Sequence, residues 1–260
     1  MYLTAAHAER DLCLLRQFVR ENPLGIFTTA IRSQVHPFIQ STHIPWLVDV
    51  DDNESETELG KLRGHIARQN PQAKAIVETL TSEQSVSQSN KNILQEEVYI
   101  LFNGPVHHYV TPSFYKITKP TTGKVAPTWN YSAVQVYGTA KIYFDSYDES
   151  TGSYLTKQLS DLSAHLETSV MGHGESEKPK AWELADAPNQ YIELLKKNII
   201  GVEIEIKSME GKFKMSQEKS EGDRDGVVEG FRNMNTAPAL EVANIIEKRA
   251  ALSEARRKDG

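Results

Sequence analysis

The stretch KVAPTWNYSAVQVYG, residues 124–138, decides the predicted fold. Its second half alternates between two faces, as successive residues of a half-buried strand do. Pro127 fixes its own φ and biases the residue before it toward extended backbone, so that four polar and aromatic side chains follow in a row at the start of the strand. They are Thr128, Trp129, Asn130 and Tyr131. Such a group can stack on a flat ring and hydrogen-bond its edge, or Trp129 can simply fill a barrel end.

Composition limits the classes of protein to which the chain can belong. At 260 residues, with 39% hydrophobic and 25% charged residues, it is typical of a globular protein with a substantial core. No window approaches the roughly 20 apolar residues of a membrane span, and the start lacks the pattern of a secretory signal, which favours a cytoplasmic protein. The single Cys13 excludes an intramolecular disulfide and a thiolate zinc cluster. A net charge of −6 argues against a strongly basic nucleic-acid surface.

Hydrophobic periodicity outlines the predicted elements. Helices are predicted at residues 7–20, 72–80, 154–167, 189–198 and 237–257. Strands are predicted at residues 25–30, 35–40, 41–50, 59–70 (ending in a turn), 97–102 with a continuation at 106–110, 131–145, 199–207 and 211–217. Residues 51–57, 81–92 and 171–180 are predicted loops. About eight strands in no regular βαβ order predict an α+β fold built on a mixed, mainly antiparallel barrel.

A second polar group lies in the connection between the strand at 59–70 and the following helix. It contains His65, Arg68 and Asn70 just before Pro71, which opens the helix. Helix-start amides and a guanidinium both favour an anion, so this connection can bind phosphate. The alternatives are a structural ion pair for Arg68 and a buried core position for His65. Elsewhere, His107 and His108 are adjacent and would point to opposite faces of a strand, so we predict no metal site.

Several segments together resemble the PaiB family of FMN-binding proteins, which are called negative transcriptional regulators. The segments are MYLTAAHA at the start, GHIARQNPQ (64–72), FNGPVHHYVTPSFY (102–115), KVAPTWNYSAVQVYG (124–138), IIGVEIEI (199–206) and GKFKMSQ (211–217). The resemblance implies a flavin-reductase-like split barrel, FMN as cofactor and a homodimer with the flavin near its interface. The chain departs from the family pattern in three longer loops, in SFY where SWY is usual, and in SQEK where an SQNR-like ending is common. Loop changes alter the rim of a site more than its floor, so they affect the expected substrate and regulatory role.

The resemblance also implies cofactor-binding residues. Arg68 would contact the phosphate, with His65 and Asn70 in support, and residues 128–131 would contact the ring system or its ribityl chain. Further candidates for the site are His43, Tyr109, Ser113, Lys212, Lys214, Ser216 and Gln217. No catalytic acid or base can be named from the sequence. We predict a main FMN-binding domain at residues 1–226, with inserted helices, and a helical tail at residues 227–260.

Three functions compete at this point. The first is a flavin-dependent oxidoreductase that acts on a small molecule in a homodimer cleft, and FMN would supply its redox chemistry. The second is a PaiB-like transcriptional regulator or sensor, although the sequence shows no helix-turn-helix or clustered basic helix. The third is a haem-binding or haem-degrading protein, for which isolated histidines offer axial ligands. These histidines are His36, His43, His65, His107, His108 and His173.

Overall fold

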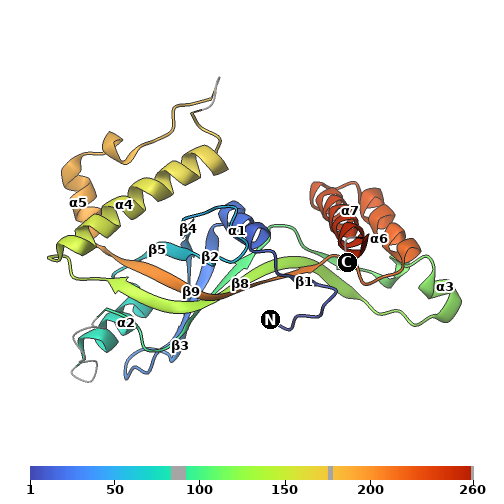
Figure 1. The fold of residues 1–260 in the computed structure, drawn as a ribbon, viewed down its shortest axis with the longest axis horizontal. Helices are drawn as coiled ribbons and strands as arrows, with labels where there is room; N and C mark the ends of the chain where they lie inside the picture. The colour runs from blue at the N-terminus through green and yellow to red at the C-terminus, as the bar shows by residue number, and fades with distance from the viewer. Residues whose placement is uncertain (83–91, 175–177, 259–260) are drawn as a thin grey trace. The chain divides into compact units, whose positions relative to one another are not determined.

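The structure, a computed structural model, describes residues 1–82, 92–174 and 178–258 (Figure 1). The chain forms two compact units. Unit 1 contains Met1–Arg10, Asn103–Val134 and Glu210–Gly260, and unit 2 contains Asp11–Phe102 and Gln135–Met209. Two long strands, β8 (Thr128–Tyr143) and β9 (Ile199–Lys214), contribute residues to both units. The loop predicted at residues 81–92 and part of that at 171–180 lie outside the described residues.

Unit 2 is built on an antiparallel sheet in the order β3-β2-β6-β8-β9-β5-β4. Strand β2 pairs with β3 and β6, and β5 pairs with β4 and β9, all antiparallel. The shorter strands are β2 (Leu24–Ala30), β3 (Ile39–Pro45), β4 (Leu47–Asp49), β5 (Lys61–Ala67) and β6 (Val98–Asn103). The helices of this unit are α1 (Leu12–Glu21), α2 (Pro71–Thr81), α4 (Glu149–His165) and α5 (Asn189–Lys197), with a π-helical turn at Leu166–Val170 and a 3-10 turn at Leu184–Asp186.

Trp46 is the largest apolar side chain in the core of unit 2, and it is 1% exposed. Its ring meets that of Phe27 edge-on, with centroids 5.7 Å apart. Two glycines make room for the indole. A Cβ atom on Gly64 would lie 2.8 Å from Trp46 Cε3, and one on Gly25 would lie 2.9 Å from Trp46 Cδ1. The motif glycine at position 64 is therefore required by packing, because any side chain there would displace the indole.

A buried arginine joins α4 to strand β5. The Arg63 side chain, 7% exposed, forms ion pairs with Asp49 and, at 2.8 Å, with Asp161 on α4. Burial alone would lower the pKa of Arg63, but the two carboxylates more than offset it and raise that pKa above its ordinary value. Tyr154, also on α4, donates its hydroxyl to the carbonyls of Gly64 and Val202 at 3.2 and 2.7 Å. These contacts fix α4 against β5 and β9.

Unit 1 pairs short strands with the ends of β8 and β9. Strand β1 (Ala8–Glu9) is antiparallel to β9, and β7 (His108–Val110) is antiparallel to β8. A 3-10 turn at Pro112–Phe114 and helix α3 (Thr118–Thr122) follow β7. Helices α6 (Glu221–Met234) and α7 (Ala237–Lys258) lie side by side (Figure 1). Their buried faces join β7 in one core, which contains Val106, Val110, Tyr115, Met215, Val227, Val228, Phe231, Ala239, Val242, Ala243 and Ile246.

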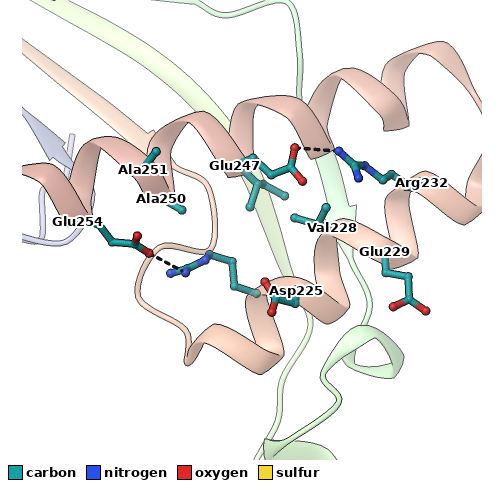
Figure 2. A pocket seen from close by; sticks show the side chains of 10 residues that line it. Asp225, Val228, Glu229, Arg232, Glu247, Ala250, Ala251 and Glu254 are labelled. Carbon is teal, nitrogen blue, oxygen red and sulfur yellow. Dashed lines mark hydrogen bonds and ion pairs between the residues drawn. The ribbon is translucent and has the colours of Figure 1, made fainter.

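Two ion pairs bridge the outer edges of the α6–α7 hairpin. Arg232 on α6 pairs with Glu247 on α7 at 2.8 Å, and Arg224 pairs with Glu254 at 3.1 Å (Figure 2). Small and branched residues of both helices face inward, while Arg232, Glu247 and Glu254 are about half exposed and Arg224 is mostly buried. Only residues 215–220 separate the end of β9 from the start of α6.

Several predicted boundaries are wrong for local reasons. The helix predicted from residue 7 begins at Leu12, because the Asp11 side chain accepts a hydrogen bond from Leu14 N and caps it there, while residues 8 and 9 form β1. The strand predicted at 35–40 begins only at Ile39. Before it, Ser33 Oγ accepts hydrogen bonds from the amides of Val35 and His36, which replaces strand pairing with a turn.

Other differences concern how segments join. The strands predicted at 199–207 and 211–217 are one strand, β9, which continues through Gly211 and ends at Lys214. The segment 106–110 does not continue β6, since Gly104-Pro105 interrupts it and β7 pairs with β8 instead. Helix α6 was not predicted, although Ser220 and Asp223 give an N-cap signal, and Ser220 Oγ accepts from Asp223 N.

The predicted fold class is nevertheless confirmed. The chain is an α+β protein with a mainly antiparallel sheet of the split-barrel type and flanking helices. The opening stretch of sequence forms most of β8, as predicted, and Pro71 opens α2. No described helix is long and apolar enough to cross a bilayer.

Candidate functional site

The start of β8 presents an exposed aromatic surface in unit 1. Trp129 lies opposite Tyr109 in the β7–β8 ladder, and their ring centroids are 6.2 Å apart in an edge-on arrangement. The imidazole of His107 lies 6.1 Å from the same indole. Trp129 is 52% exposed and Tyr109 is 42% exposed. The indole therefore does not fill the core of its unit and is available to stack on a flat ligand.

The end of β9 carries two lysines whose side chains contact the start of β8. Lys212 Nζ lies 5.6 Å from the ring centroid of Tyr131, and Lys214 Nζ donates a hydrogen bond to Thr128 Oγ1. Burial lowers the pKa of Lys214, and the neighbouring charges of Lys212 and Lys219 lower it further against the opposing effect of Glu218. Residues about 85 positions apart in the sequence thus meet beside the motif that opens β8.

A buried turn fixes this arrangement. Ser216 has a φ of 60°, in the left-handed region that non-glycine residues rarely adopt. Its hydroxyl bonds both side-chain atoms of Asn130, at 3.1 and 3.2 Å, and each of the two residues is 1% exposed. Gln217 Oε1 accepts from Met215 N, and its amide nitrogen donates to Phe213 O. Asn130, Ser216 and Gln217 therefore hold the end of β9 against β8.

The remaining candidate in unit 1 lies in the turn after β7. Ser113 Oγ is 3.0 Å from Thr111 Oγ1, and the Thr111 hydroxyl caps the 3-10 turn that contains Ser113. No hydrogen bond from Ser113 to residues 128–131 occurs in the part of the chain that the structure describes. The structure thus groups Tyr109 with Trp129, and gives Ser113 a local partner.

The second predicted group, around Arg68, lies in unit 2. Arg68 Nε donates to Lys197 O at 3.1 Å, and its Nη2 donates to Phe144 O and Ile199 O at 2.7 and 3.3 Å. These bonds join the start of β9 to the end of β8. Nη1 is the one guanidinium nitrogen for which no partner is found within residues 1–82, 92–174 and 178–258. Arg68 thus has a structural role and keeps one donor.

The neighbours of Arg68 also have local partners. Asn70 Oδ1 caps α2 by accepting from Gln72 N at 2.9 Å, and its Nδ2 donates to Thr42 Oγ1 at 3.0 Å. His65 lies on β5, where burial lowers the pKa of its imidazole, so the ring is neutral near pH 7. Its Nδ1 is buried and finds no partner among the described residues. His43 lies on β3, the edge strand, opposite Ile26.

A pocket that the sequence did not reveal lies beside Thr128, wholly within unit 1. Its volume is about 320 Å³. The lining consists of loop residues 124–128, Tyr115, Thr118, Glu218, Lys219 and Asp223, and we call it the lysine pocket. Lys124 belongs to the stretch that opens β8, and Lys219 immediately precedes the cap of α6. Lys124 and Lys219 are visible in the sequence as charged residues. That they line one pocket is seen only in the folded chain, where the buried turn at Ser216 precedes Lys219.

His7 contacts Glu218, one of the two acids that line the lysine pocket. His7 Nε2 lies 3.0 Å from Glu218 Oε2, and His7 Nδ1 lies 2.9 Å from Thr4 Oγ1. Burial alone would raise the pKa of Glu218, but hydrogen bonds and the charges of His7 and Lys219 hold it below its ordinary value. A carboxylate whose folded pKa is depressed stabilises the fold above its unfolded pKa and loses that contribution as the pH falls.

We expect the variant Glu218→Gln to be less stable than the wild type by about 1–2 kcal/mol at pH 7, because a hydrogen bond to a charged group is lost. The difference should shrink as the pH falls below the ordinary glutamate range, and vanish only once the pH is below the depressed pKa of the folded carboxyl. Urea denaturation of both proteins at pH 7 and at low pH measures it. A difference that is independent of pH would contradict the assigned role of the carboxylate.

The side chains at the start of β8 suit the chemistry of a flavin. Exposed aromatic faces can stack on an isoalloxazine ring, an ammonium and a hydroxyl can bond its polar edge, and further lysines can pair with a phosphate. An antiparallel sheet that carries such a surface fits the class of flavin-binding split-barrel proteins.

Comparison with known proteins identifies the family within this class. The chain belongs to the family described as "Putative FMN-binding domain", which matches residues 1–208. The predicted resemblance and the predicted FMN cofactor are thereby confirmed at the level of the family. An uncharacterized protein of Aspergillus fumigatus is 54% identical over 98% of this chain and 99% of its own.

Two weaker similarities are to a bacterial protein sequence and to a solved structure. The protease synthase and sporulation protein PAI 2 of Bacillus subtilis is 27% identical over 88% of each chain. The solved structure of the flavocytochrome Anf3 from Azotobacter vinelandii aligns with a TM-score of 0.44 and 11% identity, over 82% of this chain and 72% of that one.

Proposed function

We propose that this FMN-binding protein is a flavin-dependent oxidoreductase that acts on a small molecule. The observation that carries the proposal is the half-exposed indole of Trp129 at the start of β8, beside Tyr109 and two residues before Tyr131, whose ring Lys212 contacts. Bound FMN would supply the electron transfer, so the protein need only hold the ring, tune its polar edge and select what approaches it. No side chain of the protein has to act as a redox group.

Each residue of this surface has a separate part in the proposal. The half-exposed indole of Trp129 would cover one face of the ring, with Tyr131 beside it. The ammonium of Lys212 would place positive charge near the ring edge, where it stabilises negative charge. The buried Asn130 and Ser216 would keep this surface rigid, which reduces the entropy lost on binding.

We further propose that the protein acts as a homodimer in which a second copy completes the flavin site. A surface with aromatic rings exposed at 52% and 42% covers a flat ligand on one side only, and a second subunit would exclude water from the other. Sedimentation or light scattering with and without FMN tests this. A strictly monomeric protein that binds FMN tightly would refute the dimeric site.

The main test is a titration of the purified protein with FMN. We expect the flavin fluorescence to change in a saturable manner, and the visible absorbance of the bound flavin to bleach when NADH or NADPH is added without oxygen. A protein that leaves the FMN spectrum unchanged would refute flavin binding. If the protein binds FMN but neither NADH nor NADPH reduces the bound flavin, the proposed oxidoreductase activity with these donors is refuted. The protein would then be an FMN-binding protein only.

Arg68 as a partner of the FMN phosphate is a separate proposal. The variant Arg68→Lys keeps the charge but lacks the planar guanidinium whose Nε and Nη2 bond three carbonyls, so its stability should fall by about 1–3 kcal/mol. If Nη1 contacts the phosphate, the affinity for FMN should also fall about tenfold while that for riboflavin is unchanged. Riboflavin is the internal control, since it lacks only the phosphate. Equal losses for both flavins would leave Arg68 with its structural role alone.

The resemblance to the PaiB family, called negative transcriptional regulators, keeps a regulatory or sensing role as the second proposal. With a net charge of −6, duplex binding would need a local basic patch. A gel shift with random duplex DNA at two salt concentrations separates the cases. Binding that weakens with salt would support the regulator, and the absence of any shifted band at low salt would exclude direct DNA binding.

A further inference from the structure

We propose that the lysine pocket binds a phosphate-class anion through Lys124, Lys219 and the hydroxyl of Thr128. All three residues belong to unit 1 and line the same space of about 320 Å³, which is large enough for a phosphate group and part of the molecule that carries it. The proposal does not require that FMN binds, because it rests on donors and charges that the chain itself brings together.

The lining holds two lysines and two carboxylates, and Lys214, which is hydrogen-bonded to Thr128, adds a third cation beside the pocket. Lys124 is exposed, and no carboxylate partner for it is found in the described part of the chain. Lys219 Nζ lies 5.0 Å from the ring centroid of Tyr115 and 3.7 Å from Glu218 Oε1, which is too long for a hydrogen bond. Helix α6 begins beside Lys219, and the positive end of its dipole adds to the potential. A dianion would gain from all three sources.

Thr128 provides a directed donor. Its oxygen accepts a hydrogen bond from Lys214 Nζ, so the lysine orients the hydroxyl. A threonine hydroxyl can donate one hydrogen bond while it accepts others, and no acceptor for the hydrogen of Thr128 occurs among residues 1–82, 92–174 and 178–258. Burial lowers the pKa of Lys214, so this ammonium is less well hydrated than a surface lysine.

The two acids that line the pocket already accept hydrogen bonds from the protein. Asp223 accepts from Ile117 N at 2.8 Å, from Thr118 N at 3.0 Å and from the Thr118 hydroxyl. Glu218 accepts from His7 Nε2 at 3.0 Å. These hydrogen bonds stabilise the charged form of both carboxylates, so the lysines have to outweigh their repulsion of an incoming anion.

Tyr115 gives an independent indication of a missing ligand. The residue is 2% exposed, and its hydroxyl is buried without a hydrogen-bond partner in the described part of the chain. An unpaired buried hydroxyl is costly, and native proteins nearly always satisfy such groups. An anion oxygen would supply the acceptor if binding opened this hydroxyl, now closed to solvent, to the pocket that Tyr115 lines.

The test measures binding of inorganic phosphate to the full-length protein by isothermal titration calorimetry, with chloride at matched ionic strength as the reference. We expect saturable binding to the wild type, and binding weakened about tenfold or more in the double variant Lys124→Gln/Lys219→Gln, because two charge-assisted hydrogen bonds are lost. Lys248→Gln, on the exposed face of α7, is the matched control and should bind like the wild type. The exposed single variant Lys124→Gln serves if the double variant does not fold.

The source of the anion follows from a second titration with FMN and riboflavin. If the pocket takes the phosphate of FMN, the double variant loses affinity for FMN and not for riboflavin. If it takes a separate molecule, both flavins bind as before while phosphate binding is lost. Either result supports the site, and phosphate binding without any flavin binding would refute only the proposed function. Phosphate binding that is absent from the wild type, or unchanged in the double variant, would overturn the inference.

Discussion

Replacing Trp129 by alanine is expected to weaken FMN binding about 10- to 100-fold, because stacking of a flat ring on an aromatic side chain contributes roughly 1–3 kcal/mol. The indole is 52% exposed, so its loss should change the free energy of unfolding by less than about 1 kcal/mol. Trp129→Phe keeps a smaller stacking surface and should retain most of the affinity. Fluorescence titration with FMN measures all three proteins.

The chain contains a matched control for this variant. Trp182 lies in unit 2 and is 42% exposed, so Trp182→Ala removes a similar area from the surface without touching β8. We expect this control to bind FMN like the wild type. Equal affinities of Trp129→Ala and the wild type would show that the aromatic surface at the start of β8 is not the flavin site.

Replacing Trp46 by alanine should have the largest effect on stability. Truncation of a fully buried aromatic side chain costs about 3–5 kcal/mol, since it removes apolar contacts and leaves a cavity. The surroundings cannot close around the gap easily, because Gly25 and Gly64 have no side chains to move into it. The expected result is a protein that unfolds at much lower urea concentration, or that does not accumulate in a folded form at all.

Trp46→Phe keeps the variant measurable and separates packing from polarity. The indole Nε1 is buried without a hydrogen-bond partner among the described residues, so phenylalanine removes a costly group as well as some volume. We expect a loss of about 1–2 kcal/mol for Trp46→Phe. The exposed Trp182→Ala again provides the control, and a loss for Trp46→Ala no larger than that of this control would contradict the central role of Trp46.

Elements whose position depends on a single local sequence pattern were predicted well. The alternation after residue 130 gave strand β8, and Pro71 gave the start of α2, because each depends on the local preferences of a few residues. The sequence did not predict that β9 runs unbroken to Lys214, since Gly211 is indistinguishable from a turn glycine until its pairing with Glu9 is known. Helix α6 was missed because its buried face depends on α7 and β7, which are distant in the sequence.

The candidate site was predictable by residue type more than by arrangement. Thr128 and Lys214 were both chosen as candidates, but their hydrogen bond requires the turn in which Ser216 adopts a left-handed backbone, and serine rarely signals that conformation. Tyr115 and Lys219 end the SFY and SQEK motifs but were not chosen as candidates, because only the folded chain places them around one pocket. Arg68 was predicted as a phosphate partner, but the sequence did not reveal that its side chain donates hydrogen bonds to three backbone carbonyls.

The division of the sequence between the units has a consequence for synthesis. Unit 2 ends at Met209, so all of its residues have been made before the last part of unit 1, Glu210–Gly260, is translated. The core of unit 1 needs Met215 and both C-terminal helices, and its first ten residues must wait for strand β9. On the ribosome, the sheet of unit 2 can therefore assemble first, while the surface that carries Trp129 is completed only when the last helix has emerged.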